Sequence, residues 1–508
     1  MEFICSSTGP IVQTKYGKLR GYKLDGIYTF EGIPYGQAKR FHFPTPLDPW
    51  DGVKDATQYG DTAPWIEKKV NSFGNIRIPH RYWPQDEACL YLNVWSSDLT
   101  PVQKKPVMLW IHGGGFENGS SVELACYEGA NAARYGDVVL VSLNHRLNIA
   151  GYLDLSEYGD QYRNSGCAGI ADLVLALEWV RDNIAQFGGD PGNVTIFGQS
   201  GGGGKVHTLL QTPAADRLYH KAILMSGVLD VGPVATADSG KLVAKLVVQA
   251  LGLTKDTIEE IETIPFRTLA DAFLAVKPAL KAAGHRGSWA PIPGDYYKGD
   301  GRKVGFTDYA KQVPILIGST LAEFPMPDFP TKKDEIPMDR RMALLQEKYG
   351  AATQELTALY QQAYPNHNEL DLLRLDPAFR GPNLEFADRF IAEAQADLYM
   401  YLFAYDFPYN DGEPAWHCSE LPYVFHNIDC VPVCHEPVVG PRLQEQFFGA
   451  WTAFARTGDP NHPALPAWRP YRKGDEVTMI FDRECRIGVN YDRALIEKAK
   501  PFLVDWHK

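Results

Sequence analysis

The sequence predicts an α/β protein with a largely parallel central sheet, and three observations support this prediction. Apolar runs of strand length recur along the chain, and a segment with helical spacing lies between two of them. One run ends at His112-Gly113-Gly114-Gly115-Phe116, and a later one ends at Gly198-Gln199-Ser200-Gly201-Gly202. Alternating strands and helices, with glycine-rich turns where strands end, are typical of open parallel sheets.

Each expected element has its own signal along the chain. Short strands with tight turns are expected first, because β-type alternation covers Val12–Leu19 and Leu24–Phe30. A helix is expected at Ile170–Ile184, where apolar residues fall on one face. Residues 236–285 and 336–400 have mainly helical patterns. Buried strands are expected from continuous apolar runs at Leu90–Val94, Val107–Ile111, Val138–Leu143, Val194–Phe197, Ala222–Met225, Ile315–Ile317 and Tyr399–Tyr405.

The organisation of the chain favours one large domain over residues 1–508. Its 508 residues are 45% hydrophobic, which is ample for a large core. We find no repeat, low-complexity tract or flexible linker. Insertions at about 64–84 and 230–400 are expected to form a cap or side lobe and to shape a gorge above the sheet edge.

The charge balance limits the classes of partner. A formal net charge of −12 argues against nucleic acid or an anionic membrane as the main partner. No run of 18 apolar residues occurs, so no membrane span is expected. The N-terminus has neither the basic nor the apolar region of a secretory signal, and a cytoplasmic location is therefore expected.

The eight cysteines show no framework spacing and are expected to be mostly reduced. The cluster Cys430-x-x-x-Cys434-His435 is weakly similar to a metal-binding motif, but it has no second pair of ligands. A loop with buried thiols is the favoured interpretation. No metal and no cofactor are expected.

The turn at Ser200 predicts a nucleophile. A serine between a strand and a helix, with small residues two positions away on each side, is held with its hydroxyl above the sheet edge. A glycine-rich turn without chemistry is the alternative. A phosphate-binding loop does not fit, because Gln199 replaces the first glycine and Val206 the serine or threonine after Lys205.

A serine nucleophile needs a base and an acid that orients the base. Glu323 follows the strand at Ile315–Ile317 within one loop, although Asp308 and Asp328 are alternatives. His417 lies in a loop after the strand at Tyr399–Tyr405. The other late histidines are His367, His426, His435, His462 and His507.

Negative charge on the former carbonyl oxygen needs backbone N–H donors. The loop after Val107–Ile111 is rich in glycine, so its backbone can approach a substrate closely. We expect an oxyanion hole formed by Gly114 and Gly115 from this loop and Gly201 from the start of the next helix. A flexible turn is the alternative.

With these motifs the chain resembles the type-B carboxylesterase family, from about residue 10 to 475. The longest similar segment contains Phe187-Gly188-Gly189 and Val194–Gly202. Other similar segments are Phe30-Glu31-Gly32-Ile33-Pro34-Tyr35, Glu87-Ala88-Cys89-Leu90-Tyr91-Leu92-Asn93-Val94 and Gly458-Asp459-Pro460-Asn461.

The resemblance implies an α/β-hydrolase fold, with helices on both faces of a mostly parallel mixed sheet, and ester hydrolysis without a cofactor. It implies Glu323 as the acid, because Ile317–Glu323 is similar to the family's acid segment. It implies His417 as the base, because His417–Phe425 is similar to the histidine segment. A supporting serine would be Ser226, for which an ordinary strand-end serine is the alternative.

The chain also departs from the family pattern at several positions. Ala88 replaces an aspartate, while Glu87 remains and is expected to pair with Arg40 in a structural role. Cys89 lacks the partner that forms a loop disulfide in secreted relatives. Gln199 replaces a glutamate of many relatives, which weakens the case for a cationic substrate, and Gly201 replaces the usual alanine.

The sequence therefore predicts a serine carboxylesterase that acts on a small-molecule ester through an acyl-enzyme. One alternative keeps the triad but changes the bond to an amide, carbamate or thioester, or transfers the acyl group. Another is a non-catalytic binding protein of the same fold. No oligomeric state is predicted. Candidate pocket aromatics are Tyr82, Trp83, Trp289, Phe324 and Phe329.

Overall fold

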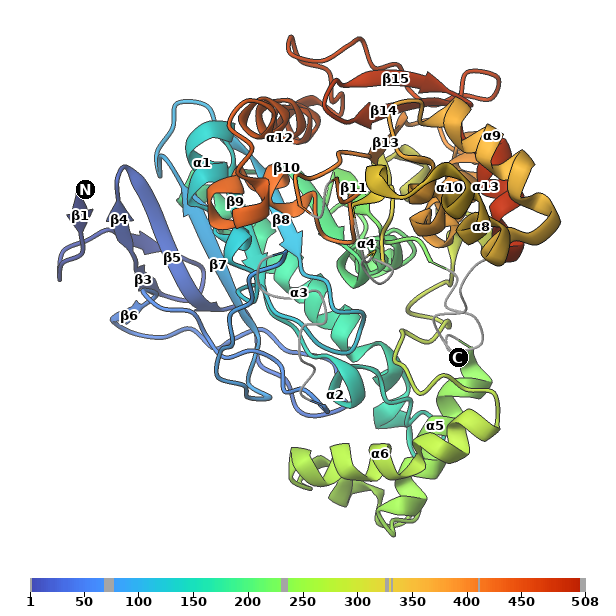
Figure 1. Ribbon diagram of the computed structural model, residues 1–508. Helices are drawn as coiled ribbons and strands as arrows, with labels where there is room; N and C mark the ends of the chain where they lie inside the picture. The colour runs from blue at the N-terminus through green and yellow to red at the C-terminus, as the bar shows by residue number, and fades with distance from the viewer. Residues whose placement is uncertain are drawn as a thin grey trace.

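The computed structural model describes residues 2–67, 77–229, 236–324, 329, 332–409 and 412–502. Within them a 12-stranded sheet runs through the molecule, from the N-terminal strands at one edge to β15 at the other (Figure 1). In spatial order its strands are β1 (Phe3–Ile4), β4 (Tyr22–Leu24), β5 (Ile27–Pro34), β7 (Tyr91–Ser96), β9 (Val139–Leu143), β8 (Lys105–Ile111), β10 (Gly189–Gln199), β11 (Lys221–Met225), β12 (Ile315–Thr320), β13 (Leu398–Phe403), β14 (Val477–Phe481) and β15 (Arg486–Val489).

The strands from β9 to β14 in this order all pair in parallel, and the strands outside them pair antiparallel. The predicted α/β class with a mostly parallel sheet is therefore confirmed. Every strand expected from a buried apolar run is present, with shifts of one to a few residues at the ends. Such shifts are common, because apolar patterning does not define where a strand ends.

The N-terminal strands differ from the prediction. The run at Val12–Leu19 is divided into β2 (Ile11–Gln13) and β3 (Lys18–Arg20), which form a small sheet with β6 (Val53–Asp55). The Thr14 hydroxyl accepts backbone N–H groups inside this run and closes a turn. In Leu24–Phe30, Asp25 and Gly26 have φ values of 45° and 87°, so a hairpin turn separates β4 from β5.

The core covers both faces of the sheet. Successive side chains of β8 enter opposite faces, so that Leu109 and Ile111 belong to one hydrophobic cluster and Met108 and Trp110 to the other. A strand buried on both sides reads as a continuous apolar run, which is why Val107–Ile111 was recognisable in the sequence.

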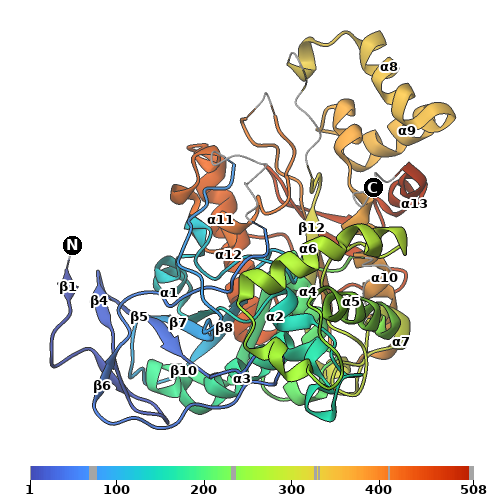
Figure 2. The ribbon, with the colours of Figure 1, turned by 90° about the horizontal axis from the view of Figure 1, so that it is seen from below.

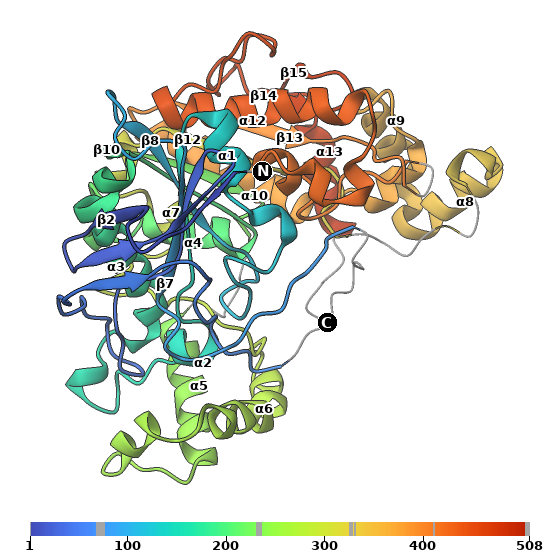
Figure 3. The ribbon, with the colours of Figure 1, turned by 90° about the vertical axis from the view of Figure 1, so that its left-hand side faces the viewer.

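Helices cover both faces of this sheet. Figure 3 shows α12 along one face and α3 on the other. Helices α5 and α6 pack on each other at one end of the molecule (Figure 1), and α8 and α9 project to the side (Figure 2). The helices are α1 (Ala130–Gly136), α2 (Asn148–Tyr152), α3 (Ala168–Asn183), α4 (Gly201–Leu209), α5 (Ala237–Ala250), α6 (Phe266–Ala282), α7 (Gly301–Val304), α8 (Met338–Tyr349), α9 (Thr353–Ala363), α10 (Pro377–Glu393), α11 (Leu421–Val424), α12 (Val439–Thr457) and α13 (Arg493–Ala499).

The helical character expected for 236–285 and 336–400 is confirmed where those segments are described. None of the helices in the described ranges has both the length and the apolar character needed to cross a bilayer. Strands β8, β10, β11, β12 and β13 are neighbours in the parallel part of the sheet, so their carboxyl ends meet at one edge. Open parallel sheets place their functional groups at this edge.

Candidate active site

Ser200 lies between β10 and α4 in a strained turn. Its φ and ψ are 57° and −127°, a conformation that L-residues rarely adopt. Its N–H donates to the Met225 carbonyl at 2.8 Å. A Cβ at Gly198 would lie 2.4 Å from the Gly202 carbonyl carbon, and one at Gly202 would lie 2.0 Å from the Ile111 oxygen. The close approach of α4 to β8 therefore explains why both flanking positions are glycine.

Glu323 and His417 form an ion pair through Glu323 Oε2 and His417 Nδ1. Their loops follow the parallel neighbours β12 and β13, and a second contact joins the loops, because the His417 N–H donates to the Glu323 carbonyl. The Ala322 N–H also donates to the Ala415 carbonyl, at 2.9 Å. The acid and the base are thus fixed by backbone as well as by side chains.

The other oxygen of the Glu323 carboxylate is also held. Ser226, directly after β11, donates its hydroxyl to Glu323 Oε1 at 2.6 Å. The Thr320 N–H donates to the same oxygen at 2.9 Å. Ser226 and Glu323 are fully buried. Both oxygens of the Glu323 carboxylate are therefore held by hydrogen-bond donors, with Oε2 directed at His417.

The alternative acids and histidines lie elsewhere. Asp308 is exposed and pairs with Lys311 at 3.4 Å, while Asp328 and His507 lie outside the described residues. The four remaining histidines, His367, His426, His435 and His462, have hydrogen-bond partners away from Ser200.

Aromatic rings and a neutral amide surround His417. Phe324 and Phe379 stack on the imidazole with ring centres at 4.7 and 5.4 Å. Gln199 Nε2 lies 3.3 Å from His417 Nε2, and Gln199 Oε1 accepts the Cys418 thiol at 3.1 Å. The amide approaches the nitrogen that would receive the Ser200 proton.

Ser200 and His417 line the same pocket. Among the described hydrogen bonds none joins the Ser200 hydroxyl to His417. Catalytic hydrogen bonds are often long in a free enzyme and shorten when substrate binds.

The loop after β8 presents backbone donors next to Ser200. Gly114 and Gly115 have φ values of 87° and 65°, and within the described residues their N–H groups donate to no protein acceptor. Gly201 begins α4, where a helix leaves its first N–H groups without an intrahelical acceptor. A Cβ at Gly201 would lie 2.4 Å from the Gly115 nitrogen, so these donors are adjacent.

Ser200, Gly114 and Gly115 border a pocket of about 470 Å³. Of the predicted aromatics, Tyr82 and Phe324 line it. Trp83 packs on Tyr59, Trp289 on Phe273, and Phe329 lies against the Arg374 guanidinium. The pocket is lined by Trp65, Ile78, His80, Tyr82, Gly113, Gly114, Gly115, Glu117, Asn118, Glu123, Leu124, Tyr127, Gln199, Ser200, Phe324, His417 and Cys418.

One buried carboxyl group near Glu323 has no distinctive signal in the sequence. Glu420 is fully buried, and neither of its oxygens has a hydrogen-bond partner in the described part of the chain. Burial, and then repulsion from Glu323, raise the pKa of the Glu420 carboxyl well above its ordinary value. Burial and repulsion thus disfavour a second negative charge near Glu323.

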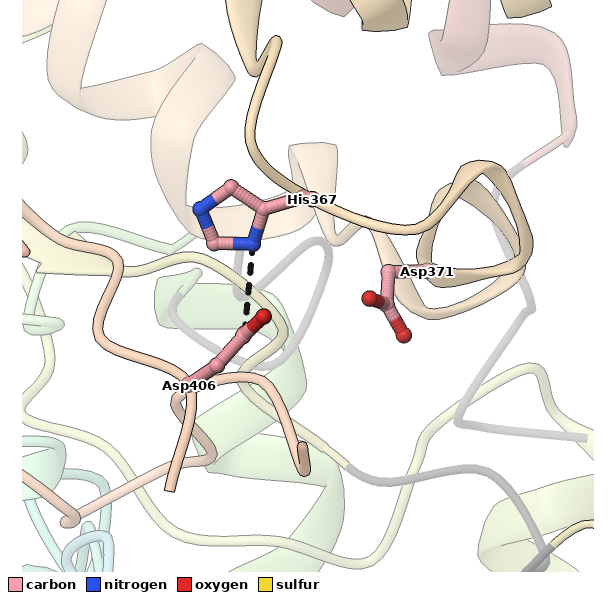
Figure 4. A group of neighbouring side chains, drawn as sticks. All are labelled: His367, Asp371 and Asp406. Atoms are coloured by element: carbon pink, nitrogen blue, oxygen red, sulfur yellow. Dashed lines mark ion pairs between the residues drawn. The ribbon is translucent and has the colours of Figure 1, made fainter. Parts of the chain in front are cut away.

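A second cluster of charged residues lies away from the pocket (Figure 4). The His367 ring faces Asp406 at 3.2 Å, and Lys333 Nζ lies 2.7 Å from Asp371. Both carboxylates are thus already paired with cations, and the arrangement is that of an ion network rather than a cation site. The expected pair of Arg40 and Glu87 is present, with Arg40 Nε donating to Glu87 Oε2 at 2.7 Å.

Comparison with known proteins defines the class. Residues 8–495 match the carboxylesterase family. The chain is 33% identical to a para-nitrobenzyl esterase of Bacillus subtilis (94% of this chain, 96% of the relative) and 32% identical to a phenmedipham hydrolase of Pseudarthrobacter oxydans (94% and 96%). It superposes with a TM-score of 0.95 on an esterase of Clostridium hathewayi that can hydrolyze aliphatic aromatic polyesters, at 48% identity (99% of this chain, 100% of that structure).

The fold and these relatives define a carboxylic ester hydrolase of the α/β-hydrolase fold, and the predicted fold and activity are confirmed. The chain belongs to the carboxylesterase family. It is a serine carboxylesterase, whose substrates are small-molecule esters.

Proposed function

We propose that Ser200, His417 and Glu323 are the catalytic triad of this carboxylesterase. The observation that supports this most strongly is the continuous chain from Ser226 through Glu323 to His417, which ends in the pocket lined by Ser200. His417 takes the hydroxyl proton as Ser200 attacks the ester carbonyl, and Glu323 stabilises the imidazolium that forms.

The collapse of the tetrahedral intermediate releases the alcohol, which receives the proton from His417. Water then attacks the acyl-enzyme with His417 as base, and the carboxylic acid leaves as Ser200 regains its proton. We assign the oxyanion hole to the N–H groups of Gly114, Gly115 and Gly201, since the first two have no competing acceptor among the described residues.

The pocket supports an ester with an aromatic or bulky apolar part. Trp65, Tyr82, Tyr127 and Phe324 line it, and burial against such rings favours apolar groups. The relatives named after a para-nitrobenzyl ester and after aliphatic aromatic polyesters agree with this chemistry. Gln199 adds no negative charge, which does not favour a cationic alcohol.

Replacing Ser200 with alanine tests the assignment. The variant should lose nearly all turnover of p-nitrophenyl acetate and p-nitrophenyl benzoate, because Ser200 is the one serine or threonine among the described residues that line the pocket. An organophosphate probe should label Ser200 in the wild type and leave the variant unlabelled. Retention of more than a few per cent of the rate, or labelling elsewhere with loss of activity, would contradict the proposal.

We further propose one large domain over 1–508, in which the segments at about 64–84 and 230–400 shape the gorge. Trp65, Ile78 and Phe324 in the pocket wall support this.

A cytoplasmic location is supported by the eight free cysteines, several of them buried. Thiol titration of the unreduced, unfolded protein should find all eight. The net charge of −12 supports a small-molecule partner rather than nucleic acid.

A further inference from the structure

Lys205 is a buried cation that the mechanism above does not use. It lies in α4, just over one turn after Ser200, and its residue is fully buried. Its Nζ donates to the His112 carbonyl at 3.1 Å and lies 5.8 Å from the centre of the Phe116 ring. Within the described residues this is the one hydrogen bond that the ammonium makes.

Burying an ammonium group with so few partners is costly. Burial lowers the pKa of Lys205 to about 7, and attraction to Glu123 opposes this shift. The rings of His112 and His145, stacked at 5.0 Å, face the same group; burial and the charge of Lys205 lower their pKa well below the ordinary value, so both stay neutral. An apolar side chain at this position would give a more stable folded protein. The presence of Lys205 therefore points to a role in function.

The acceptor of Lys205 is the carbonyl of the residue immediately before Gly113-Gly114-Gly115. We call these three glycines the oxyanion loop. A trans peptide is planar, and its C=O and N–H point in opposite directions. Holding the His112 oxygen against α4 therefore fixes the plane of the peptide that enters Gly113. Gly113, Gly114 and Gly115 have no side chains that could anchor the loop. The Gly114 carbonyl accepts the N–H groups of Glu117 and Asn118 further along the chain, whereas Lys205 connects the loop to α4.

We infer that Lys205 is a positioning residue for the oxyanion hole: its ammonium clamps the His112 carbonyl and so holds the N–H groups of Gly114 and Gly115 at the distance that the tetrahedral intermediate requires. The inference rests on the proposed function of that loop. Attraction to Glu123, on the pocket wall, opposes the loss of the Lys205 proton, and burial raises the pKa of the Glu123 carboxyl itself to about 7.

Two substitutions separate charge, hydrogen bonding and folding. Lys205→Met has a similar shape without charge, and Lys205→Gln retains a donor. We expect Lys205→Met to fold with an equal or higher Tm, to keep its KM within about twofold, and to lose about 10- to 100-fold in kcat for p-nitrophenyl acetate. Its affinity for an aryl trifluoromethyl ketone, which forms an oxyanion on the serine, should fall by a similar factor. Lys205→Gln should recover part of both losses.

Lys221→Met is the matched control. Lys221 is also buried, with a pKa lowered by burial to about 8, but it begins β11 at the end of the strand opposite Ser226. Its kcat should stay within about twofold of wild type. A Lys205→Met variant with wild-type kcat and ketone affinity would overturn the inference, and so would a loss that appears in KM alone. An inactive wild-type protein would instead overturn the proposed function.

Discussion

Adding one methyl group at Gly201 should displace the oxyanion loop. The new Cβ would lie 2.2 Å from the Gly115 oxygen, and 2.4 Å from both its Cα and its nitrogen. Non-bonded heavy atoms settle at roughly 3.5–4.0 Å, so the loop must retreat by about 1 Å or more. A shift of this size costs about 10²-fold in rate, comparable to the loss of one oxyanion donor. We therefore expect Gly201→Ala to lower kcat about 100-fold.

The same substitution three residues later provides the control. A Cβ at Gly204 would first meet the Gly227 oxygen at 3.5 Å and the Phe116 ring at 3.7 Å, which are ordinary contacts. Gly204→Ala should therefore keep its kcat and gain about 0.5–1 kcal/mol of stability, because alanine favours a helix over glycine. Both variants are measured by the hydrolysis of p-nitrophenyl acetate and by thermal unfolding.

The comparison of the two variants can refute the reasoning. If Gly201→Ala retains more than about a third of the wild-type kcat, the loop does not depend on the close approach at Gly201, and the argument from the 2.2–2.4 Å contacts is wrong. If Gly204→Ala loses activity equally, the effect belongs to α4 and not to the oxyanion loop.

Three other predictions follow from named contacts. Ser226→Ala removes the 2.6 Å donor from Glu323 Oε1, which is worth about 1.5–3 kcal/mol for a charged acceptor, so we expect about a tenfold loss in kcat or a comparable loss of stability; unchanged kcat and Tm would contradict a supporting role. Gln199→Glu places a carboxylate beside His417, which favours the imidazolium, so the acid limb of the kcat/KM profile should move to higher pH; an unmoved limb would contradict the 3.3 Å contact. Burial lowers the pKa of His367, but bonds to Asp406 and Asp482 outweigh this and raise it to about 10. Protonated His367 therefore stabilises the fold fully below pH about 6.5, which is the pKa of histidine in the unfolded chain. This stabilisation is lost as pH rises through about 10, the pKa in the folded protein. Urea unfolding should show wild type losing more stability than His367→Gln between pH 7 and 10, and parallel losses would contradict the ion network.

The sequence predicted best those parts of the site that lie at strand ends. Ser200, Ser226, Glu323 and His417 each follow a buried apolar run within one turn or loop, and parallel strands bring such positions to the same edge. The signal for a strand lies in its own residues. The end of a strand can therefore be predicted to within a few residues without knowledge of the rest of the fold. This is why the catalytic candidates were recognisable without knowing how the helices pack.

The pocket wall could not be predicted in the same way. Trp65, Ile78 and Leu124 lie in irregular segments without periodicity, and Tyr127 lies in a three-residue 3₁₀ turn, so their positions are set by long-range packing. Glu420 lies inside a segment similar to the family's histidine segment, but its raised pKa depends on burial and on the nearby Glu323. The one sequence feature of Lys205 is a poor fit to a phosphate-binding loop, and nothing in the sequence places its ammonium against His112.

The four glycines that begin α4 lower the stability of this helix but allow its backbone to approach neighbouring segments closely. A Cβ at Gly201, Gly202 or Gly203 would lie within 2.7 Å of the backbone of the oxyanion loop, β8 or Gly227, whereas Gly204 has room. Each glycine inside a helix costs about 1 kcal/mol relative to alanine, so three cost roughly 3 kcal/mol. In return, the backbone of α4 directly after Ser200 can pack against the backbone of the oxyanion loop. This contact between two backbones has no side chains to stabilise it. The hydrogen bond from Lys205 of α4 to the His112 carbonyl supplies that stabilisation.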